Sequence, residues 1–230
     1  MEKRLNLKLS VIVPMLNEAE QLPELLVHLL PLQRAGHEII FADGGSTDGS
    51  ATLSEEAGFN VLHTARGRAK QMNAGAAQAS GDVLLFLHAD TRLPQGAVRH
   101  IEQALSHEGC CWGRFDVCIT SRLFMLRVVS RLMNWRSRLT GIATGDQAIF
   151  VRRTVFDQLQ GFPDQPLMED VELSKRLRAF SRPSCIAHCV VTSGRRWEMR
   201  GVWHTILLMW RLRWAYWRGR DASELARLYR

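Results

Sequence analysis

The stretch Leu84-Leu85-Phe86-Leu87-His88-Ala89-Asp90 places an apolar run directly before two polar side chains. Four bulky apolar residues in succession are typical of a strand that is covered on both faces. Such strands occur in parallel sheets, where ligands bind outside the carboxyl ends of the strands. The sequence therefore predicts that His88 and Asp90 lie at a ligand-binding edge, although Asp90 taken alone is more often a turn or helix-cap residue.

A strand–helix rhythm leads up to this stretch. Strands are expected at residues 10–15, 37–42, 60–63 and 82–88, and helices beginning near residue 22 and spanning 50–57 and 66–79. This alternation predicts right-handed crossovers and an α/β fold, with a mainly parallel central sheet flanked by helices. Beyond an exit loop at 91–94 the rhythm loosens. Helices are expected at 95–106, 122–139, 155–159, 168–180 and 198–218, and strands at 110–120, 148–152 and 184–191.

Polar residues follow successive strand ends in the first half of the chain. These residues are Asn17 with Glu18, then Asp43, then His88 with Asp90. Together they would crowd the edge of a parallel sheet at which a nucleotide binds. Asp43 then accepts hydrogen bonds from a base or ribose, or else it only shapes its Asp-Gly-Gly turn.

Phosphates would need neutralising groups from elsewhere, because the Walker P-loop and the Rossmann glycine fingerprint are both missing. Asp90 is a candidate ligand for Mg²⁺ or Mn²⁺, hard cations that bridge carboxylates and phosphates. Arg66 and Arg68 are basic candidates nearby.

The net charge of +7 comes from the C-terminal fifth of the chain. Residues 181–230 hold ten arginines, no lysine and three acidic residues, whereas residues 1–180 balance. Tryptophans from Trp203 to Trp217 recur at helical steps among these arginines. Three interpretations compete, in this order of preference: a helix packed on the domain, an interfacial helix on anionic lipid, and a nucleic-acid surface. We expect no nucleic-acid partner.

The organisation and location of the chain follow from length and composition. With 230 residues and no evident linker, we expect one domain at 1–197 and a basic, Trp-rich amphipathic helical tail at 198–230 packed on it. Five cysteines, few and odd in number, favour a reducing compartment. No apolar run reaches the roughly 18 residues of a membrane-spanning helix. We expect a cytoplasmic protein, with peripheral contact at the inner face of the plasma membrane as the membrane alternative.

Four motifs in a fixed order add a family resemblance. They are Val13-Pro14-x-x-Asn17-Glu18, Asp43-Gly44-Gly45-Ser46-Thr47-Asp48, Gly81-Asp82 followed by Leu87-His88-Ala89-Asp90, and Glu169-Asp170. The ordered set resembles family 2 glycosyltransferases, which have the Rossmann-like GT-A fold. The wording Gly67-Arg68-Ala69-x-Gln71-Met72-Asn73 and Glu169-Asp170-Val171-Glu172-Leu173 is similar to a small bacterial subgroup named for a suspected part in arsenosugar biosynthesis.

The resemblance implies an inverting transfer from a UDP- or GDP-sugar to a hydroxyl acceptor. The sequence does not identify this acceptor, and lipid-linked molecules are among the candidates. It implies Asp170 as the general base beside Glu169, and Asp90 as the ligand of Mg²⁺ or Mn²⁺, with His88 in place of the first aspartate of the metal motif. The donor-side positions that it implies are Pro14, Asn17, Glu18, Asp43, Arg66, Arg68, Asn73, His88 and Ala89.

The resemblance also implies that residues 1–197 form a catalytic domain, with a nucleotide-binding half at 1–94 and an acceptor-binding half at 95–197. Asp146 is expected to contact the acceptor or the sugar. Arg196 and Trp197 would clamp diphosphate and acceptor, but Ser193 stands where processive relatives have Gln, which argues against processive polymerisation. Two alternatives remain: a nucleotidyltransferase acting on a sugar phosphate, and a non-catalytic, membrane-associated nucleotide-sugar binding protein.

Overall fold

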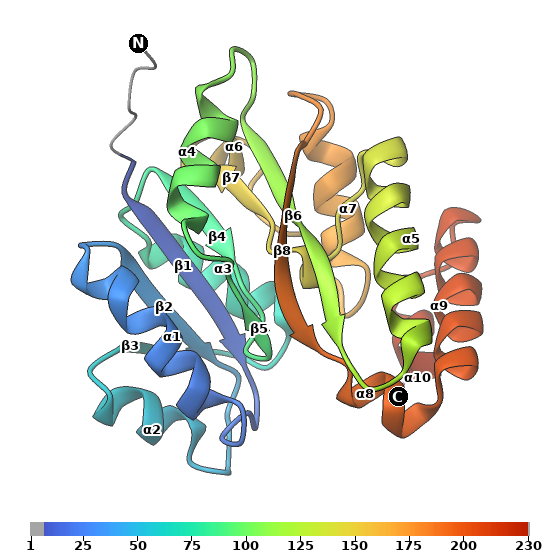
Figure 1. Cartoon of the computed structure of the whole chain (residues 1–230), viewed down its shortest axis with the longest axis horizontal. Coiled ribbons are helices and arrows are strands. Elements are labelled where there is room, and N and C mark those ends of the chain that lie inside the picture. The colour runs from blue at the N-terminus through green and yellow to red at the C-terminus, as the bar shows by residue number, and fades with distance from the viewer. Residues whose placement is uncertain (1–6, 230) are drawn as a thin grey trace.

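The structure is a computed structural model that describes residues 7–229, apart from the side chain of Arg196. Within these residues one sheet of eight strands runs through the molecule in the order β3-β2-β1-β4-β7-β6-β8-β5 (Figure 1). The strands are β1 Leu9–Met15, β2 Glu38–Asp43, β3 Asn60–His63, β4 Val83–Phe86, β5 Thr91–Arg92, β6 Trp112–Thr120, β7 Phe150–Arg152 and β8 Ser184–Ser193. The helices are α1 Leu22–Arg34, α2 Ser50–Glu56, α3 Arg68–Gln78, α4 Ala97–Ser106, α5 Phe124–Thr140, α6 Arg153–Gln158, α7 Glu169–Leu177, α8 Arg195–Arg200, α9 Val202–Trp217 and α10 Ala222–Tyr229, with a 3₁₀ turn, η1, at Gly145–Gln147.

The strand directions gather the polar strand ends at one edge. Strands β1 to β4 are mutually parallel, and β7 runs antiparallel between β4 and β6. Strand β8 is parallel to β6, so both point the same way as β1 and β4. The carboxyl ends of β1, β2, β4, β6 and β8 therefore share an edge, which confirms the predicted α/β fold with a mainly parallel sheet.

Different helices pack against the apolar side chains on the two faces of the sheet. On one face, Val11 and Leu85 belong to a buried cluster with Leu25 of α1 and Ile101 of α4. On the other face, Ile12 and Leu84 pack with side chains of α3, α6 and α7. Because consecutive strand residues point to opposite faces, the continuous apolar runs of β1 and β4 supply both clusters.

Two sequence-based boundaries are wrong. The predicted exit loop at 91–94 contains β5, which pairs antiparallel with β8 through Thr91 and Arg92. The single helix predicted over 198–218 is divided into α8 and α9 at Gly201, whose φ of +81° is readily adopted only by glycine. A further helix, α10, follows.

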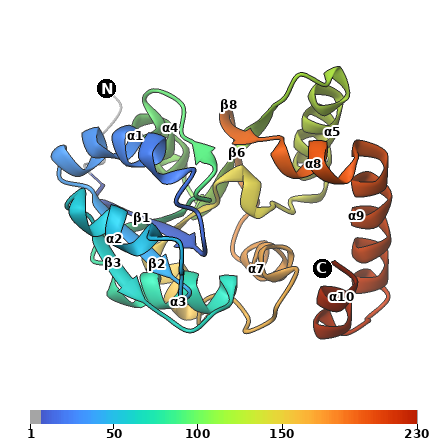
Figure 2. The same ribbon diagram turned by 90° about the horizontal axis from the view of Figure 1, so that it is seen from below.

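The C-terminal helices pack beside the start of α7. Leu212 of α9 and Leu225 of α10 form a small buried cluster with Met168, the residue that precedes α7. Figure 2 shows α9 and α10 next to α7 and far from α1 and α2. Within residues 7–229, no helix has the length and apolar character needed to cross a membrane.

Candidate active site

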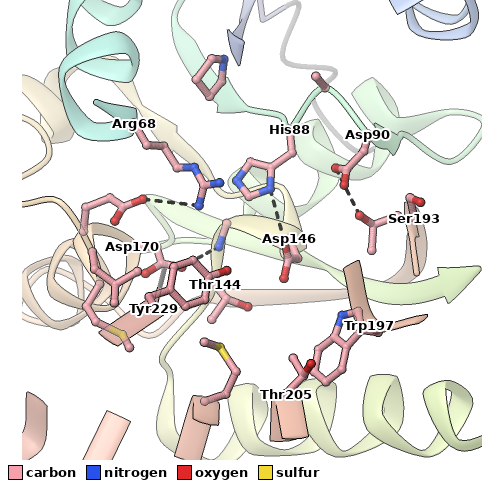
Figure 3. Close-up of a pocket in the computed structure, with 18 of the residues that line it drawn as sticks. Arg68, His88, Asp90, Thr144, Asp146, Asp170, Ser193, Trp197, Thr205 and Tyr229 are labelled. Carbon is pink, nitrogen blue, oxygen red and sulfur yellow. Dashed lines mark hydrogen bonds and ion pairs between the residues drawn. The ribbon is translucent and has the colours of Figure 1, made fainter. Parts of the chain in front are cut away.

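A pocket opens at the carboxyl edge of the sheet. Its walls come from the end of β1 and the loop after it, the start of α3, the residues that follow β4, the ends of β6 and β8, the η1 turn, the first turn of α7 and the C-terminal helices. Side chains from distant parts of the sequence therefore face one another, as Figure 3 shows for His88, Asp146, Asp170 and Trp197.

Helix α7 begins in the pocket with two carboxylates. Met168 adopts a left-handed φ of +64°, and Glu169 and Asp170 form the first helical residues, where the helix dipole favours negative charge. The Oδ2 atom of Asp170 accepts a hydrogen bond from the Gly145 N–H at 2.8 Å, and Oδ1 accepts one from the Val171 N–H at 2.7 Å. These two bonds fix the orientation of the Asp170 carboxylate.

Glu169 is buried beside Asp170, with 4% of its surface exposed. Burial raises the pKa of its carboxyl, and the charge of Asp170 raises it further, while Arg68 opposes both. The Glu169 Oε1 atom lies 3.8 Å from Nη1 of Arg68. The pair of neighbouring carboxylates is thus partly compensated by one guanidinium from the start of α3.

His88 is held between Asp146 and Gly145. Its Nδ1 atom lies 3.2 Å from Oδ1 of Asp146, and its Nε2 atom is buried without a hydrogen-bond partner in the described part of the chain. A Cβ atom on Gly145 would lie only 2.4 Å from that Nε2 atom. His88 therefore positions the η1 turn, whose Gly145 N–H binds Asp170.

Asp90 has a carboxylate oxygen that can hold a cation. Its Oδ1 atom accepts hydrogen bonds from the hydroxyls of Thr91 at 3.2 Å and Thr192 at 3.4 Å, which are brought there by the pairing of β5 with β8. Its Oδ2 atom takes no part in these bonds. The described residues contain no group of three potential metal-ligating side chains, so protein ligands alone would not complete a metal shell.

The charge of the pocket fits a cation shared between protein and ligand. Among the described side chains, five carboxylates line it, against two guanidinium groups: Glu18, Asp90, Asp146, Glu169 and Asp170 against Arg68 and Arg213. This surplus of negative charge would repel a diphosphate unless a cation entered with it. Mg²⁺ and Mn²⁺ are commonly held by one or two carboxylates together with substrate phosphates, and Asp90 fits that arrangement.

Two nucleotide-side candidates, Asn17 and Asp43, are used within their own turns. Asp43 is 2% exposed and accepts hydrogen bonds from the backbone N–H groups of Gly45 and Ser46, each at 3.0 Å. Asn17 Oδ1 accepts one from the Thr47 N–H at 2.8 Å. Both residues lie near the carboxyl edge but outside the lining of the pocket, which brings Asp90 and Asp170 together without Asp43.

The remaining predicted positions also divide into residues that line the pocket and residues that lie outside its lining. Pro14, Glu18, Arg68, Ala89, Asp146 and Trp197 line the pocket, together with the residues described above. Asn73 faces the backbone of Phe162, donating to its carbonyl and accepting from its N–H, both at 2.8 Å. Arg66 is exposed on the loop before α3. The side chain of Arg196 lies outside the described residues.

The C-terminal helices also line the pocket, which the sequence reasoning did not foresee. Thr205, Met209 and Arg213 of α9 face it, as does Tyr229 of α10. The three α9 residues recur every four positions, which places them on one side of the helix. The four-residue spacing of these side chains could have predicted this contact, but the tryptophans of the same helix drew the prediction toward packing and membrane contact.

Sequence comparison assigns the chain to a family. The family model described as "Glycosyl transferase family 2" matches residues 10–159, which include Asp43, Asp90 and Asp146. The chain belongs to glycosyl transferase family 2.

Its most similar relatives include an undecaprenyl-phosphate 4-deoxy-4-formamido-L-arabinose transferase of Pseudomonas fluorescens (strain SBW25), 34% identical over 65% of this chain and 48% of the relative. A protein of the same name from Proteus mirabilis is 30% identical over 63% of this chain and 48% of that protein. The chain thus spans about half the length of these relatives.

Solved structures of glycosyltransferases share the fold. A mannosyltransferase from Pyrobaculum calidifontis, in complex with GDP-Man and Mn²⁺, has a TM-score of 0.64 and 21% identity, over 92% of this chain and 61% of that one. TarS from S. aureus in complex with UDP has a TM-score of 0.65 and 19% identity, over 81% of this chain and 60% of that one. These matches confirm the predicted GT-A fold.

Proposed function

We propose that the protein transfers a sugar, with inversion, from a UDP- or GDP-sugar to an oxygen of a lipid-linked phosphate acceptor. The observation that carries the proposal is that Asp90 and Asp170, from opposite halves of the sequence, line one pocket at the carboxyl edge of the sheet. Membership of the family supports sugar transfer, and the complexes of the structural neighbours support a nucleotide-sugar donor.

Asp170 is the proposed general base. An oxygen of the monoprotonated acceptor phosphate attacks the anomeric carbon, the bond from that carbon to the diphosphate breaks, and the phosphate proton passes to the Asp170 carboxylate. The hydrogen bonds from Gly145 and Val171 hold this carboxylate in place before the substrate arrives. Glu169 and Arg68 form the charged wall behind it.

Asp90 would hold Mg²⁺ or Mn²⁺ together with the donor diphosphate. A bound divalent cation stabilises the charge that develops on a leaving diphosphate. The cations in the structural neighbours support this choice of metal. Arg68 contributes a second positive charge on the donor side of the pocket.

The acceptor class comes from the relatives, whose names specify undecaprenyl phosphate. The more specific expectation of a role in arsenosugar biosynthesis rests on motif wording alone. Arg196 and Trp197 remain proposed acceptor-side residues, and Asp146 a proposed acceptor or sugar contact.

We also propose peripheral contact with the inner face of the plasma membrane. The side of α9 that faces away from the pocket carries a tryptophan face, which we define as Trp203, Leu207, Trp210, Trp214 and Trp217. Each of these side chains is 61–76% exposed. Exposed arginines accompany them at Arg211, Arg218 and Arg220. Tryptophan and arginine together favour the interface of an anionic bilayer, where the rings enter the headgroup region and the cations meet lipid phosphates.

Vesicle sedimentation tests this contact. Wild-type protein should sediment with phosphatidylglycerol-containing vesicles at low salt and less at high salt. A variant with Trp210→Ser and Trp214→Ser should sediment several-fold less, whereas the control Val27→Ser, at an equally exposed site on α1, should behave as wild type. Equal vesicle binding by the double variant would contradict the membrane assignment. The same conclusion would follow if the wild type were a dimer and the double substitution made it a monomer without changing vesicle binding.

A doubly labelled donor tests the reaction. With one isotope in the sugar and another in the nucleoside, the acceptor product should carry the sugar label alone, and the anomeric configuration should be opposite to that of the donor. Transfer of the nucleoside label would instead indicate a nucleotidyltransferase. Tight donor binding without any product from a panel of prenyl phosphates would favour a binding protein.

A further inference from the structure

A guanidinium group with one unsatisfied buried nitrogen lies on the C-terminal side of the pocket. Arg213 of α9 lines the pocket, and its Nε atom is buried without a hydrogen-bond partner in the described part of the chain. Burying part of a charged group without a partner is costly, so such a group is a ready ligand for an anion. By contrast, the other guanidinium that lines the pocket, that of Arg68, is paired with Glu169.

Arg213 reaches the pocket from α9, one of the C-terminal helices. In Figure 3, Trp197 of α8 and Thr205 of α9 lie across the pocket from His88, whereas Tyr229 of α10 lies beside Asp170. Asp90, the proposed cation ligand, follows β4 on the donor side. Arg213 and Asp90 thus come from different elements, which allows an anion at Arg213 to be a second anionic group beside the donor diphosphate.

The pocket also offers apolar surface to a ligand. Its lining contains apolar or largely apolar side chains from four different segments: Ile119, Leu167, Met168, Trp197 and Met209. Met side chains adapt to flexible aliphatic ligands because they are unbranched and polarisable. A ligand that satisfies both features carries a phosphate at one end and a hydrocarbon chain behind it.

We propose that Arg213 is the acceptor-phosphate ligand and that the inner side of α9, with Thr205 and Met209, forms the acceptor subsite for a prenyl phosphate. The proposal rests on the proposed transfer reaction. It assigns acceptor binding to residues outside the matched family region, which ends at residue 159. Helix α9 then serves two purposes, because Thr205, Met209 and Arg213 line the pocket while the tryptophan face of the same helix is exposed.

Binding of a short, soluble prenyl phosphate tests the subsite. Calorimetric titration with geranyl phosphate, in the absence of vesicles, should show binding to the wild type that Arg213→Gln weakens by about 10- to 100-fold, the usual effect of losing a charge-assisted hydrogen bond. The matched control is Arg227→Gln, which makes the same charge change at an exposed position on the neighbouring helix α10, outside the pocket lining, and should leave binding unchanged. Arg213→Lys should restore part of the affinity, and thermal melts should show that all three variants are folded.

Other ligands separate the outcomes. Geraniol and inorganic phosphate should each bind at least about 10-fold more weakly than geranyl phosphate, and binding of UDP or GDP with Mn²⁺ should be equal in wild type and Arg213→Gln. A loss of nucleotide binding in Arg213→Gln would place Arg213 on the donor diphosphate and overturn the subsite. Equal binding of inorganic phosphate would remove the apolar chain from the proposal. Sugar transfer by the wild type together with unchanged geranyl phosphate binding in Arg213→Gln would overturn the subsite and leave the proposed function standing, whereas failure of the wild type to bind any nucleotide would count against the function itself.

Discussion

A methyl group at Gly145 should disturb the catalytic carboxylate through His88. In Gly145→Ala the new Cβ would lie 2.4 Å from His88 Nε2, whereas ordinary contacts begin near 3.4 Å, so one of the two groups must move by about 1 Å. The His88 side chain is only 14% exposed and has little room to yield. Overpacking of this kind costs about 1–3 kcal/mol of unfolding free energy.

The same shift should reduce activity. Movement of His88 breaks its 3.2 Å contact with Asp146, and movement of the η1 turn displaces the N–H that holds Asp170. A misplacement of about 1 Å in an active site costs on the order of 10²-fold in turnover. We therefore expect Gly145→Ala to lose both stability in urea denaturation and turnover of the nucleotide-sugar donor.

A double-mutant cycle isolates the cause. In a His88→Ala background the clashing ring is gone, so Gly145→Ala should add less than about 0.5 kcal/mol of destabilisation. An equal cost in both backgrounds, or a single variant as stable and active as wild type, would refute the contact between His88 and Gly145 as the reason for glycine at this position.

Three other variants test separate parts of the site. Asp90→Asn should abolish the increase in melting temperature that Mn²⁺ adds to UDP or GDP binding, while Asp164→Asn, an exposed control, should retain it; an unchanged increase in Asp90→Asn would show that the cation binds elsewhere. Because the pKa of Glu169 is raised, the folded state favours the protonated carboxyl, and wild-type stability in urea denaturation should fall as the pH rises above the ordinary glutamate pKa. Glu169→Gln should remove that part of the decline. Identical pH profiles of the two proteins would contradict the burial of this charge. Asn73→Ala should cost about 1–3 kcal/mol by leaving the Phe162 backbone unpaired, with donor KM unchanged, and a raised KM at unchanged stability would instead make Asn73 a donor ligand.

The pattern of the sequence was sufficient to predict the sheet and the donor-side wall of the pocket. The apolar runs of β1 and β4 are local signals, and parallel pairing brings Glu18, His88 and Asp90 to the same edge without further information. Strand β5 escaped prediction because it is two residues long and its partner, Thr192, is about one hundred residues away in the chain.

The other differences have physical reasons that local patterns do not contain. Asn17, Asp43 and Asn73 have short polar side chains whose hydrogen bonds are satisfied by nearby backbone, so their residue types alone do not separate turn formation from ligand binding. The contribution of α9 to the pocket depends on the packing of Leu212 and Leu225 against Met168, a contact between distant segments.

The most direct test of the account is the turnover of Asp170→Asn. The substitution keeps the size of the side chain but removes its ability to take a proton, so turnover should fall by about 10²- to 10⁴-fold. Binding of UDP or GDP with Mn²⁺ should stay at the wild-type level, because Asp90 and Arg68 are intact. Wild-type turnover in the Asp170→Asn protein would contradict the role of Asp170 and with it the proposed reaction in this pocket.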